Sequence, residues 1–156
     1  MQEIVFIRRI DMYIDGFEWV VYDKLPSEAI MIRKLVFVEE QGFRNEFDEI
    51  DEDDKTKHIV VYKDSEPIGT CRFYKKEGEY NIGRIAVVKK YRGKGVGAIV
   101  VHYAEEKIFE MGGTVISLSA QVRTKSFYEK IGYVGEGNIY LDEMCPHIRM
   151  RKRIGR

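Results

Sequence analysis

Three glycines and two cations within residues 92–98 have the types and spacing that could bind a phosphate group. The segment lies between an apolar run, residues 82–88, and an amphipathic run, residues 96–111. Alternating glycines let a backbone approach an anion closely, and a following helix points its first N–H groups and its positive dipole end at the charge. The pattern therefore predicts a phosphate-binding loop. A turn that only joins strand to helix is the weaker interpretation.

Two better-defined phosphate motifs fit this loop less well. A P-loop needs Gly-Lys followed by Ser or Thr at a fixed spacing, and that triplet is missing. Gly93-x-Gly95-x-x-Ala98 formally matches the dinucleotide fingerprint, which also needs an acidic residue about 20 positions on to hold the ribose. No carboxylate occurs between Met111 and Tyr128. A nucleotide-binding oxidoreductase is therefore a weak alternative.

The segment 85–97 resembles the acetyl-CoA motif of the GCN5-related N-acetyltransferase (GNAT) family. That motif is an apolar strand followed by Arg/Gln-x-x-Gly-x-Gly/Ala at the start of a helix, and Arg92, Gly95 and Gly97 fill the three places. A second segment, at the separation that the family shows, supports the same identification.

This second segment, residues 121–133, resembles the family's Asn-x-x-Ala-x-x-x-Tyr element and the Glu-Lys-Leu-Gly-Phe that follows it. Gln121 and Thr124 stand where asparagine and alanine are usual, which puts the cofactor contact of Gln121 in doubt. The resemblance is good over residues 80–135. The chain is thereby identified as a small bacterial member of the GNAT family.

The resemblance implies acetyl transfer from acetyl-CoA, the co-substrate, to a primary amine by direct attack in a ternary complex. The CoA pyrophosphate would lie on the loop and first helical turn, and the pantetheine arm would pair like an extra strand along the preceding strand. The backbone N–H of Val87 would polarise the thioester carbonyl. The expected cofactor-binding residues are Ile85, Ala86, Val87, Arg92, Gly93, Lys94, Gly95, Val96, Gly97, Ala98 and Gln121.

The same resemblance implies catalytic roles around the thioester. Tyr128 is expected to be the general acid that protonates the departing thiolate, the alternative being a core aromatic. Glu40 is expected to be the second catalytic residue, and Glu39 and His147 are expected to border the acceptor. The general base stays open among these three, since solvated carboxylates and a structural histidine are equally good interpretations. A non-catalytic acyl-CoA-binding sensor or regulatory module of the same fold is the alternative function.

Charge is distributed unevenly along the chain. Residues 46–54 are strongly acidic and could attract a cationic acceptor such as a polyamine, aminosugar or lysine, although charge runs are more often solvated loops. The run lacks the ligand spacing of an EF-hand, and no metal site is expected. With 26 basic and 26 acidic residues, the balance argues against a nucleic-acid partner. The basic tail, residues 149–156, is interpreted as solvated.

Apolar periodicity and turn signals predict the elements that position these residues. Strands are expected over residues 4–14, 17–22, 59–62, 68–74, 80–88, 114–120, 133–134 and 148–150, and helices over 26–41, 96–111 and 124–131. On the first helix Met31, Leu35 and Val38 form one stripe. The expected fold class is α/β, mixed α+β: a GNAT-like, splayed, mostly antiparallel mixed sheet flanked by helices.

Length and composition bound the remaining expectations. The 156 residues, 44% apolar and 33% charged, predict one soluble globular domain over residues 1–156. Cys71 and Cys145 are expected to be reduced thiols. The sequence shows no signal peptide or membrane span, so a cytoplasmic location is expected. The expected partner is a small-molecule or peptide amine, with no membrane or nucleic acid, and a homodimer stays open.

Overall fold

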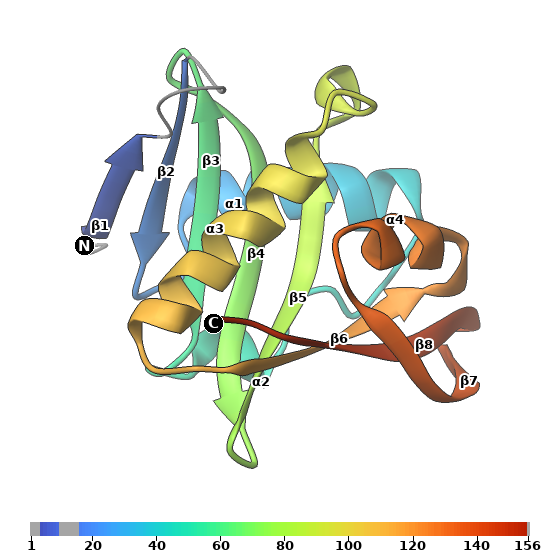
Figure 1. Ribbon diagram of the computed structural model, residues 1–156. Coiled ribbons are helices and arrows are strands. Elements are labelled where there is room, and N and C mark those ends of the chain that lie inside the picture. The colour runs from blue at the N-terminus through green and yellow to red at the C-terminus, as the bar shows by residue number, and fades with distance from the viewer. Residues whose placement is uncertain (1–3, 10–15, 156) are drawn as a thin grey trace.

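The structure is a computed structural model that describes the backbone of residues 4–9 and 16–155 and the side chains of residues 16–155. In this part of the chain, strands form a single sheet in the spatial order β1-β2-β3-β4-β5-β6-β8-β7 (Figure 1). The strands are β1 Ile4–Arg9, β2 Phe17–Tyr22, β3 Lys57–Lys63, β4 Glu66–Lys76, β5 Glu79–Val87, β6 Val115–Gln121, β7 Val134–Asp142 and β8 Cys145–Arg153.

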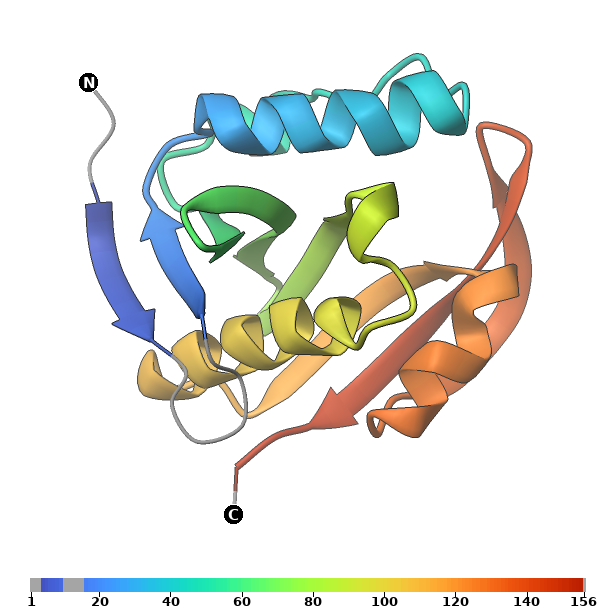
Figure 2. The same ribbon diagram turned by 90° about the horizontal axis from the view of Figure 1, so that it is seen from above.

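Helices cover both faces of this sheet. Figure 2 shows the first helical segment on one face, and α3 and α4 on the other. The helical elements are α1 Ser27–Arg33, the π-helix η1 Lys34–Glu40, α2 Glu49–Glu52, the 3₁₀ turn η2 Lys89–Tyr91, α3 Val96–Glu110, the 3₁₀ turn η3 Val122–Thr124 and α4 Lys125–Lys130. None of the helices in the described part of the chain has both the length and the apolar content needed to cross a membrane.

The sheet splays between β5 and β6, as expected from the sequence. These are its only parallel neighbours among the described strands, and they pair only where Tyr80–Ile82 lies beside Ile116–Leu118. Beyond Ile82 the two strands diverge, while β6 stays paired with β8 on its other side along its whole length. Residues 83–87 of β5 therefore have no strand partner on that side within the described structure. This open edge leads directly to the glycine-rich loop.

The main core lies between the sheet and α3. Val100, Ala104 and Ile108 are fully buried on the inner side of α3, and the rings of Trp19 and Tyr103 stack with centroids 4.5 Å apart. Burying such side chains stabilises the fold by about 1.5–3 kcal/mol each. Because this packing fixes α3 on the sheet, it also fixes the loop at the N-terminus of α3.

The first helix turns a different face to the sheet from the one that its apolar stripe indicated. Met31, Leu35 and Val38 are exposed by 44%, 39% and 38%, whereas Ile32 and Arg33 are buried. The sequence interpretation was wrong because apolar residues occur on two sides of this helix. Buried ion pairs to Arg33 select the inner side, and the π-helical geometry of η1 changes the angular spacing of the later residues.

The C-terminal hairpin is longer than the sequence indicated. β7 and β8 have nine residues each, where only residues 133–134 and 148–150 were expected to be strands. Most of β7 is exposed and contains two glycines, so it lacks the buried apolar pattern on which the expectation depended. At the other end, the strand expected over residues 4–14 corresponds to β1, while residues 10–14 lie outside the described residues.

Candidate functional site

A cavity of about 460 Å³ lies where β5 and β6 diverge. The two strands form its sides, the end of η1 and the loop after it form another wall, and the turn between β7 and β8 closes it. Its lining residues are Phe37, Gln41, Phe43, Asn45, Glu46, Asp48, Ile82, Gly83, Arg84, Ile85, Ser119, Gln121, Arg123, Thr124, Tyr128, Asp142, Glu143 and His147. Four elements distant in sequence thus meet around one polar chamber.

A second, groove-like cavity of about 410 Å³ continues from the first along the open edge of β5. The two cavities share Gln41, Ile85, Arg123 and Thr124, so they form one continuous path. Its other lining residues are Val36, Glu40, Ala86, Val87 and Arg92. The path therefore leads from the glycine-rich loop to the chamber that Tyr128 and His147 line.

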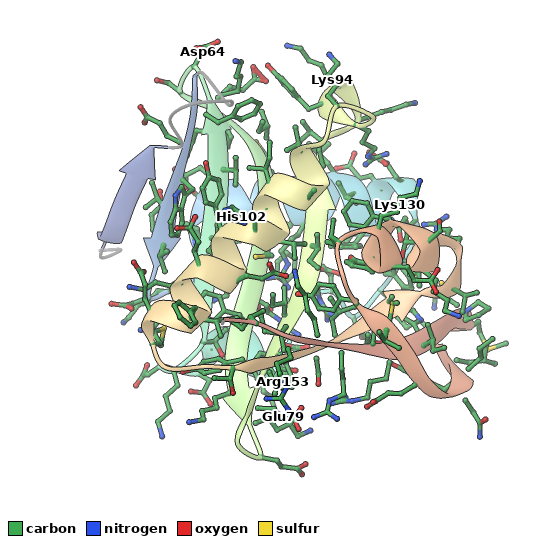
Figure 3. All side chains as sticks on the ribbon, viewed as in Figure 1. Asp64, Glu79, Lys94, His102, Lys130 and Arg153 are labelled. Atoms are coloured by element: carbon green, nitrogen blue, oxygen red, sulfur yellow. The ribbon has the colours of Figure 1, made fainter. Side chains whose placement is uncertain are left out.

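The glycine-rich loop has the backbone geometry of an anion-binding turn. Gly93 and Gly95 have φ of 76° and 81°, the left-handed region that side chains with a Cβ rarely adopt. A Cβ on either would meet no atom within 4 Å, so conformation rather than packing requires glycine there. Gly95 is the N-cap of α3 and makes no side-chain cap hydrogen bond, which leaves first-turn N–H groups available to a ligand. Figure 3 labels Lys94 on this loop.

Glycine is favoured at position 97 for a different physical reason from that at positions 93 and 95. It lies in the first turn of α3, and a Cβ there would come within 3.2 Å of the Phe127 ring. Its small size lets α4 approach the N-terminal end of α3. This contact positions the next residue, Tyr128, relative to the loop.

The side chain of Arg92 turns away from the loop and back over the groove. Its Nε donates to the Val87 carbonyl at 2.9 Å, and its Nη2 lies 2.7 Å from Oε1 of Glu40. Glu40, expected to be catalytic, therefore lines the groove and is paired with a cation. It is not among the residues that line the chamber, and the exposed Glu39 lines neither cavity.

Gln121 bridges two sides of the opening. Its Nε2 donates to Oε1 of Gln41 at 2.8 Å, and its Oε1 accepts from Nε of Arg123, also at 2.8 Å. Both ends of the amide are thus used within the protein, joining the end of the first helical segment to the end of β6. These contacts position the side chain, and its expected contact with the cofactor stays a prediction.

Tyr128 lies on α4 with its ring buried, yet it lines the chamber. Phe127 packs edge-on against it at 4.9 Å between centroids. Burial raises the pKa of the Tyr128 phenol, and the nearby Cys71 thiol acts in the same direction. The phenol therefore keeps its proton at neutral pH, as a hydrogen-bond donor must.

His147 lies on β8 opposite Gln121 and is buried except where it lines the chamber. Its Nδ1 lies 2.8 Å from the carbonyl oxygen of Cys145. The Tyr140 ring stacks on it, with centroids 6.0 Å apart, and the Tyr140 hydroxyl is hydrogen-bonded to the Ser119 hydroxyl. The imidazole is thus held in one orientation from both neighbouring strands.

The acidic segment forms a buried ion cluster under the chamber rather than a fully solvated loop. Arg33 donates to Oε2 of Glu46 at 2.8 Å and to both carboxylate oxygens of Asp51 at 2.8 and 2.9 Å. Burial raises the pKa of Glu46. For Asp51 burial acts in the same direction, but hydrogen bonds and charge from Arg33 and Arg72 outweigh it and lower the pKa.

Two further arginines complete this cluster. Arg72 Nη1 donates to Asp48 at 2.7 Å and to Asp51 at 2.9 Å, and Arg84 bridges Glu46 and Asp48 at 3.1 and 3.2 Å. Arg84 has φ of 51°, at the register slip between β4 and β5. Three carboxylates and three guanidinium groups balance, so these carboxylates do not provide an unpaired negative charge for a cationic acceptor.

The sequence reasoning missed the cluster and several chamber residues. Arg33 offered one signal in principle, because a buried charge needs anionic partners, but the expected apolar stripe placed it on the outer side of the helix. No comparable signal marks Phe43, Ser119 or Asp142, because their sequence neighbourhoods are ordinary loop and strand. Among the described residues, no group of three or more His, Cys, Asp and Glu side chains could hold a metal ion.

Comparison with known proteins gives the same picture of the fold. A family profile described as "Acetyltransferase (GNAT) domain" matches residues 26–154. The "Uncharacterized N-acetyltransferase YjcF" of Bacillus subtilis (strain 168) is 38% identical over 128 residues, 81% of this chain and 91% of that protein. 

Solved structures agree with these sequence matches. A putative N-acetyltransferase from Lactobacillus plantarum superposes with a TM-score of 0.81 at 29% identity, covering 89% of this chain and 99% of the other. An acyl-CoA N-acyltransferase from Pseudomonas aeruginosa gives 0.78 at 26% identity, covering 87% and 99%.

Proposed function

Because the chain belongs to the GNAT acetyltransferase family, whose activity is acyl transfer from coenzyme A to an amine, we propose that it transfers acetyl from acetyl-CoA to a primary amine. The amine attacks the thioester directly while both substrates are bound. One observation carries this proposal: the continuous path from the glycine-rich loop, along the open edge of β5, to the polar chamber. A long cofactor entering at the loop would deliver its thioester to the chamber.

The pyrophosphate would bind the loop and first turn of α3, from Gly93 to Ala98. Left-handed Gly93 and Gly95 direct backbone N–H groups outward, and the positive end of a 15-residue helix adds to the attraction. Lys94 supplies a flexible charge. Arg92 would bind phosphate only after leaving Glu40, so cofactor phosphate and Glu40 compete for the same guanidinium group.

The pantetheine arm would pair with Val87. The Val88 N–H donates to the Ile68 carbonyl on β4, and backbone groups alternate in direction along a strand. The Val87 N–H and carbonyl therefore point to the open side, where the carbonyl already accepts from Arg92. The Ala86 groups point toward β4, so Ala86 and Ile85 would contribute mainly packing. The Val87 N–H is the donor that would polarise the thioester carbonyl.

Tyr128 would act as the general acid. Its phenol lines the chamber, and its raised pKa keeps the proton in place until the thiolate departs. Transfer of that proton to sulfur makes CoA a better leaving group. General acid catalysis contributes about 10²- to 10⁴-fold to a rate.

Calorimetric titration with acetyl-CoA, CoA and NAD(P)H tests the cofactor first. Saturable binding of acetyl-CoA and CoA, without NAD(P)H binding, is expected. Thiol release is then measured with a panel comprising spermidine, glucosamine, an aminoglycoside and a lysine-containing peptide. Turnover should fall about 10²-fold or more in Tyr128→Phe, while acetyl-CoA affinity stays unchanged.

Two outcomes contradict the proposal. The absence of binding to acetyl-CoA or CoA refutes the cofactor assignment. Binding without thiol release, for every amine and with no difference between wild type and Tyr128→Phe, favours the non-catalytic acyl-CoA-binding module instead. Lys130→Gln is a matched control, because it alters an exposed side chain of the same helix that lines neither cavity.

A further inference from the structure

From its fixed tautomer, we infer that His147 is the general base that deprotonates the acceptor amine, an assignment that rests on the proposed acetyl transfer. An alkylamine is mostly cationic at neutral pH and must lose a proton before it can attack a thioester. The base must therefore lie in the chamber, have a free lone pair and be mostly unprotonated near neutral pH. These requirements can be checked against His147 and against the carboxylates of the buried ion cluster and of the groove.

The hydrogen bond to Cys145 fixes the tautomer. A carbonyl oxygen can only accept, so the Nδ1 of His147, 2.8 Å away, must carry a hydrogen. In the neutral imidazole the lone pair is then on Nε2. Nε2 has no hydrogen-bond partner among the described residues, and His147 lines the chamber. Stacking on Tyr140 restrains the plane of the ring, and the hydrogen bond to Cys145 selects which nitrogen faces the carbonyl.

The carboxylates near the chamber meet these requirements less well. Oε2 of Glu46 is held by two guanidinium groups, Arg33 and Arg84, so this oxygen is already occupied by cationic partners. Asp48 is paired with Arg72 and Arg84 in the same way. Glu40 lies in the groove and is paired with Arg92. Of these four groups, only His147 both lines the chamber and forms no ion pair with a cation in the described structure.

The groups facing His147 come from every wall of the chamber. Gln121 lies opposite it on β6, and Tyr140 stacks on it from β7. The charged and titratable groups that share the chamber are Glu46, Asp48, Arg84, Arg123, Asp142, Glu143 and Tyr128.

His147 and Tyr128 together account for every proton that moves in the reaction. Nε2 accepts one proton from the alkylammonium group, directly or through one water, and later releases it to solvent. The neutral amine attacks the thioester, so that a C–N bond forms and the C–S bond breaks. Tyr128 gives its proton to the sulfur and regains one from the new amide nitrogen. The net products are the N-acetylated amine, CoA thiol and one proton.

Nuclear magnetic resonance of the histidine rings tests the tautomer in the wild-type protein, without any acceptor. The chain has three histidines, so ¹⁵N-labelled imidazole signals can be assigned by substituting each in turn. For neutral His147 the expected pattern is a protonated Nδ1 and an unprotonated Nε2. A protonated Nε2 in the neutral ring would overturn the inference, because the lone pair would then face the Cys145 carbonyl.

Kinetics of His147→Gln tests the role itself, with whichever amine of the panel gives the fastest thiol release. Expected are a fall in kcat of about 10²-fold near pH 7, loss of the acidic limb of the pH profile and unchanged acetyl-CoA affinity. His102→Gln is the matched control. That residue, labelled on α3 in Figure 3, is exposed and does not line the chamber. It should change neither rate nor profile.

The outcomes separate this inference from the proposed function. If wild type turns over but His147→Gln keeps the wild-type acidic limb and rate, the base assignment is refuted and acetyl transfer stands. If wild type binds no acetyl-CoA, the proposed function fails, whatever the histidine signals show. Loss of acetyl-CoA binding in His147→Gln alone would indicate a structural role and would also overturn the assignment.

Discussion

Replacing Gly95 by alanine should weaken acetyl-CoA binding by about 5- to 30-fold without unfolding the protein. Gly95 has φ of 81°, and a Cβ there meets no atom within 4 Å, so the only cost is conformational. An L-residue in the left-handed region costs about 1–2 kcal/mol. A loop that relaxes to avoid this cost is less often in the binding conformation. The apparent dissociation constant for acetyl-CoA rises by the factor by which that population falls.

Gly97→Ala is the informative comparison, because the motif requires glycine at position 95 but accepts alanine at position 97, and the structure supplies a physical reason for the difference. Here the added Cβ lies 3.2 Å from the Phe127 ring, and φ is not in the left-handed region. Crowding against that ring is offset by the better helix propensity of alanine, worth up to about 1 kcal/mol. Acetyl-CoA affinity should therefore change by no more than about threefold, since the backbone N–H groups keep their directions.

Calorimetry gives both dissociation constants, and urea unfolding checks that each variant folds with a loss of at most about 2 kcal/mol. Wild-type affinity in Gly95→Ala would refute the claim that left-handed backbone geometry forms the phosphate site. Equal losses of affinity in both variants would also refute it. That result would show that close approach of the cofactor, rather than conformation, requires the glycines.

Two further predictions concern ionisable groups. Glu40→Gln should tighten acetyl-CoA binding by up to about fivefold without lowering kcat, since a partly exposed ion pair such as that with Arg92 is worth at most about 1 kcal/mol. A large fall in kcat at unchanged affinity would instead make Glu40 the base. Burial lowers the pKa of His58 from 6.5 to about 4. Above about pH 6.5 the histidine is neutral in both the folded and the unfolded protein, and its contribution to stability is complete. As the pH falls toward 4, the unfolded protein binds a proton that the folded protein does not, and this contribution is lost. Between these pH values the free energy of unfolding, measured with urea, should change by up to about 3 kcal/mol less in His58→Gln than in wild type. Parallel curves of unfolding free energy against pH would contradict this contribution of His58.

The buried ion cluster could not be predicted from the local sequence. An acidic run such as residues 46–54 usually indicates a solvated loop, and most of this run is exposed. Glu46 and Asp51 are nevertheless buried, because Arg33 and Arg72 face the same interior from a helix and a strand. Pairing among four separate segments depends on how they pack, which no single segment reveals.

The roles of Glu40 and Gln121 were similarly open at the sequence level. The sequence placed both near the cofactor or the acceptor, and both do lie along the path between the loop and the chamber. Their partners could not be deduced, because Arg92 and Gln41 reach them only after the helix and the strands have packed. A side chain's availability for chemistry depends on what else can bind it.

The sequence by itself determined the elements with strong local signals: the glycine-rich loop, the helix that follows it, the splayed sheet and the family to which they belong. The loop and the helix follow from backbone freedom at glycine and apolar periodicity, which are local properties, whereas the splay and the family follow from the resemblance of the two motifs. Only the tertiary structure decided which face of the first helix is buried, that three carboxylates of the acidic segment pair with arginines, and that Nδ1 of His147 lies against the Cys145 carbonyl. The first two of these depend on contacts between segments distant in the chain, where burial makes an unpaired charge or polar group costly and so selects one arrangement.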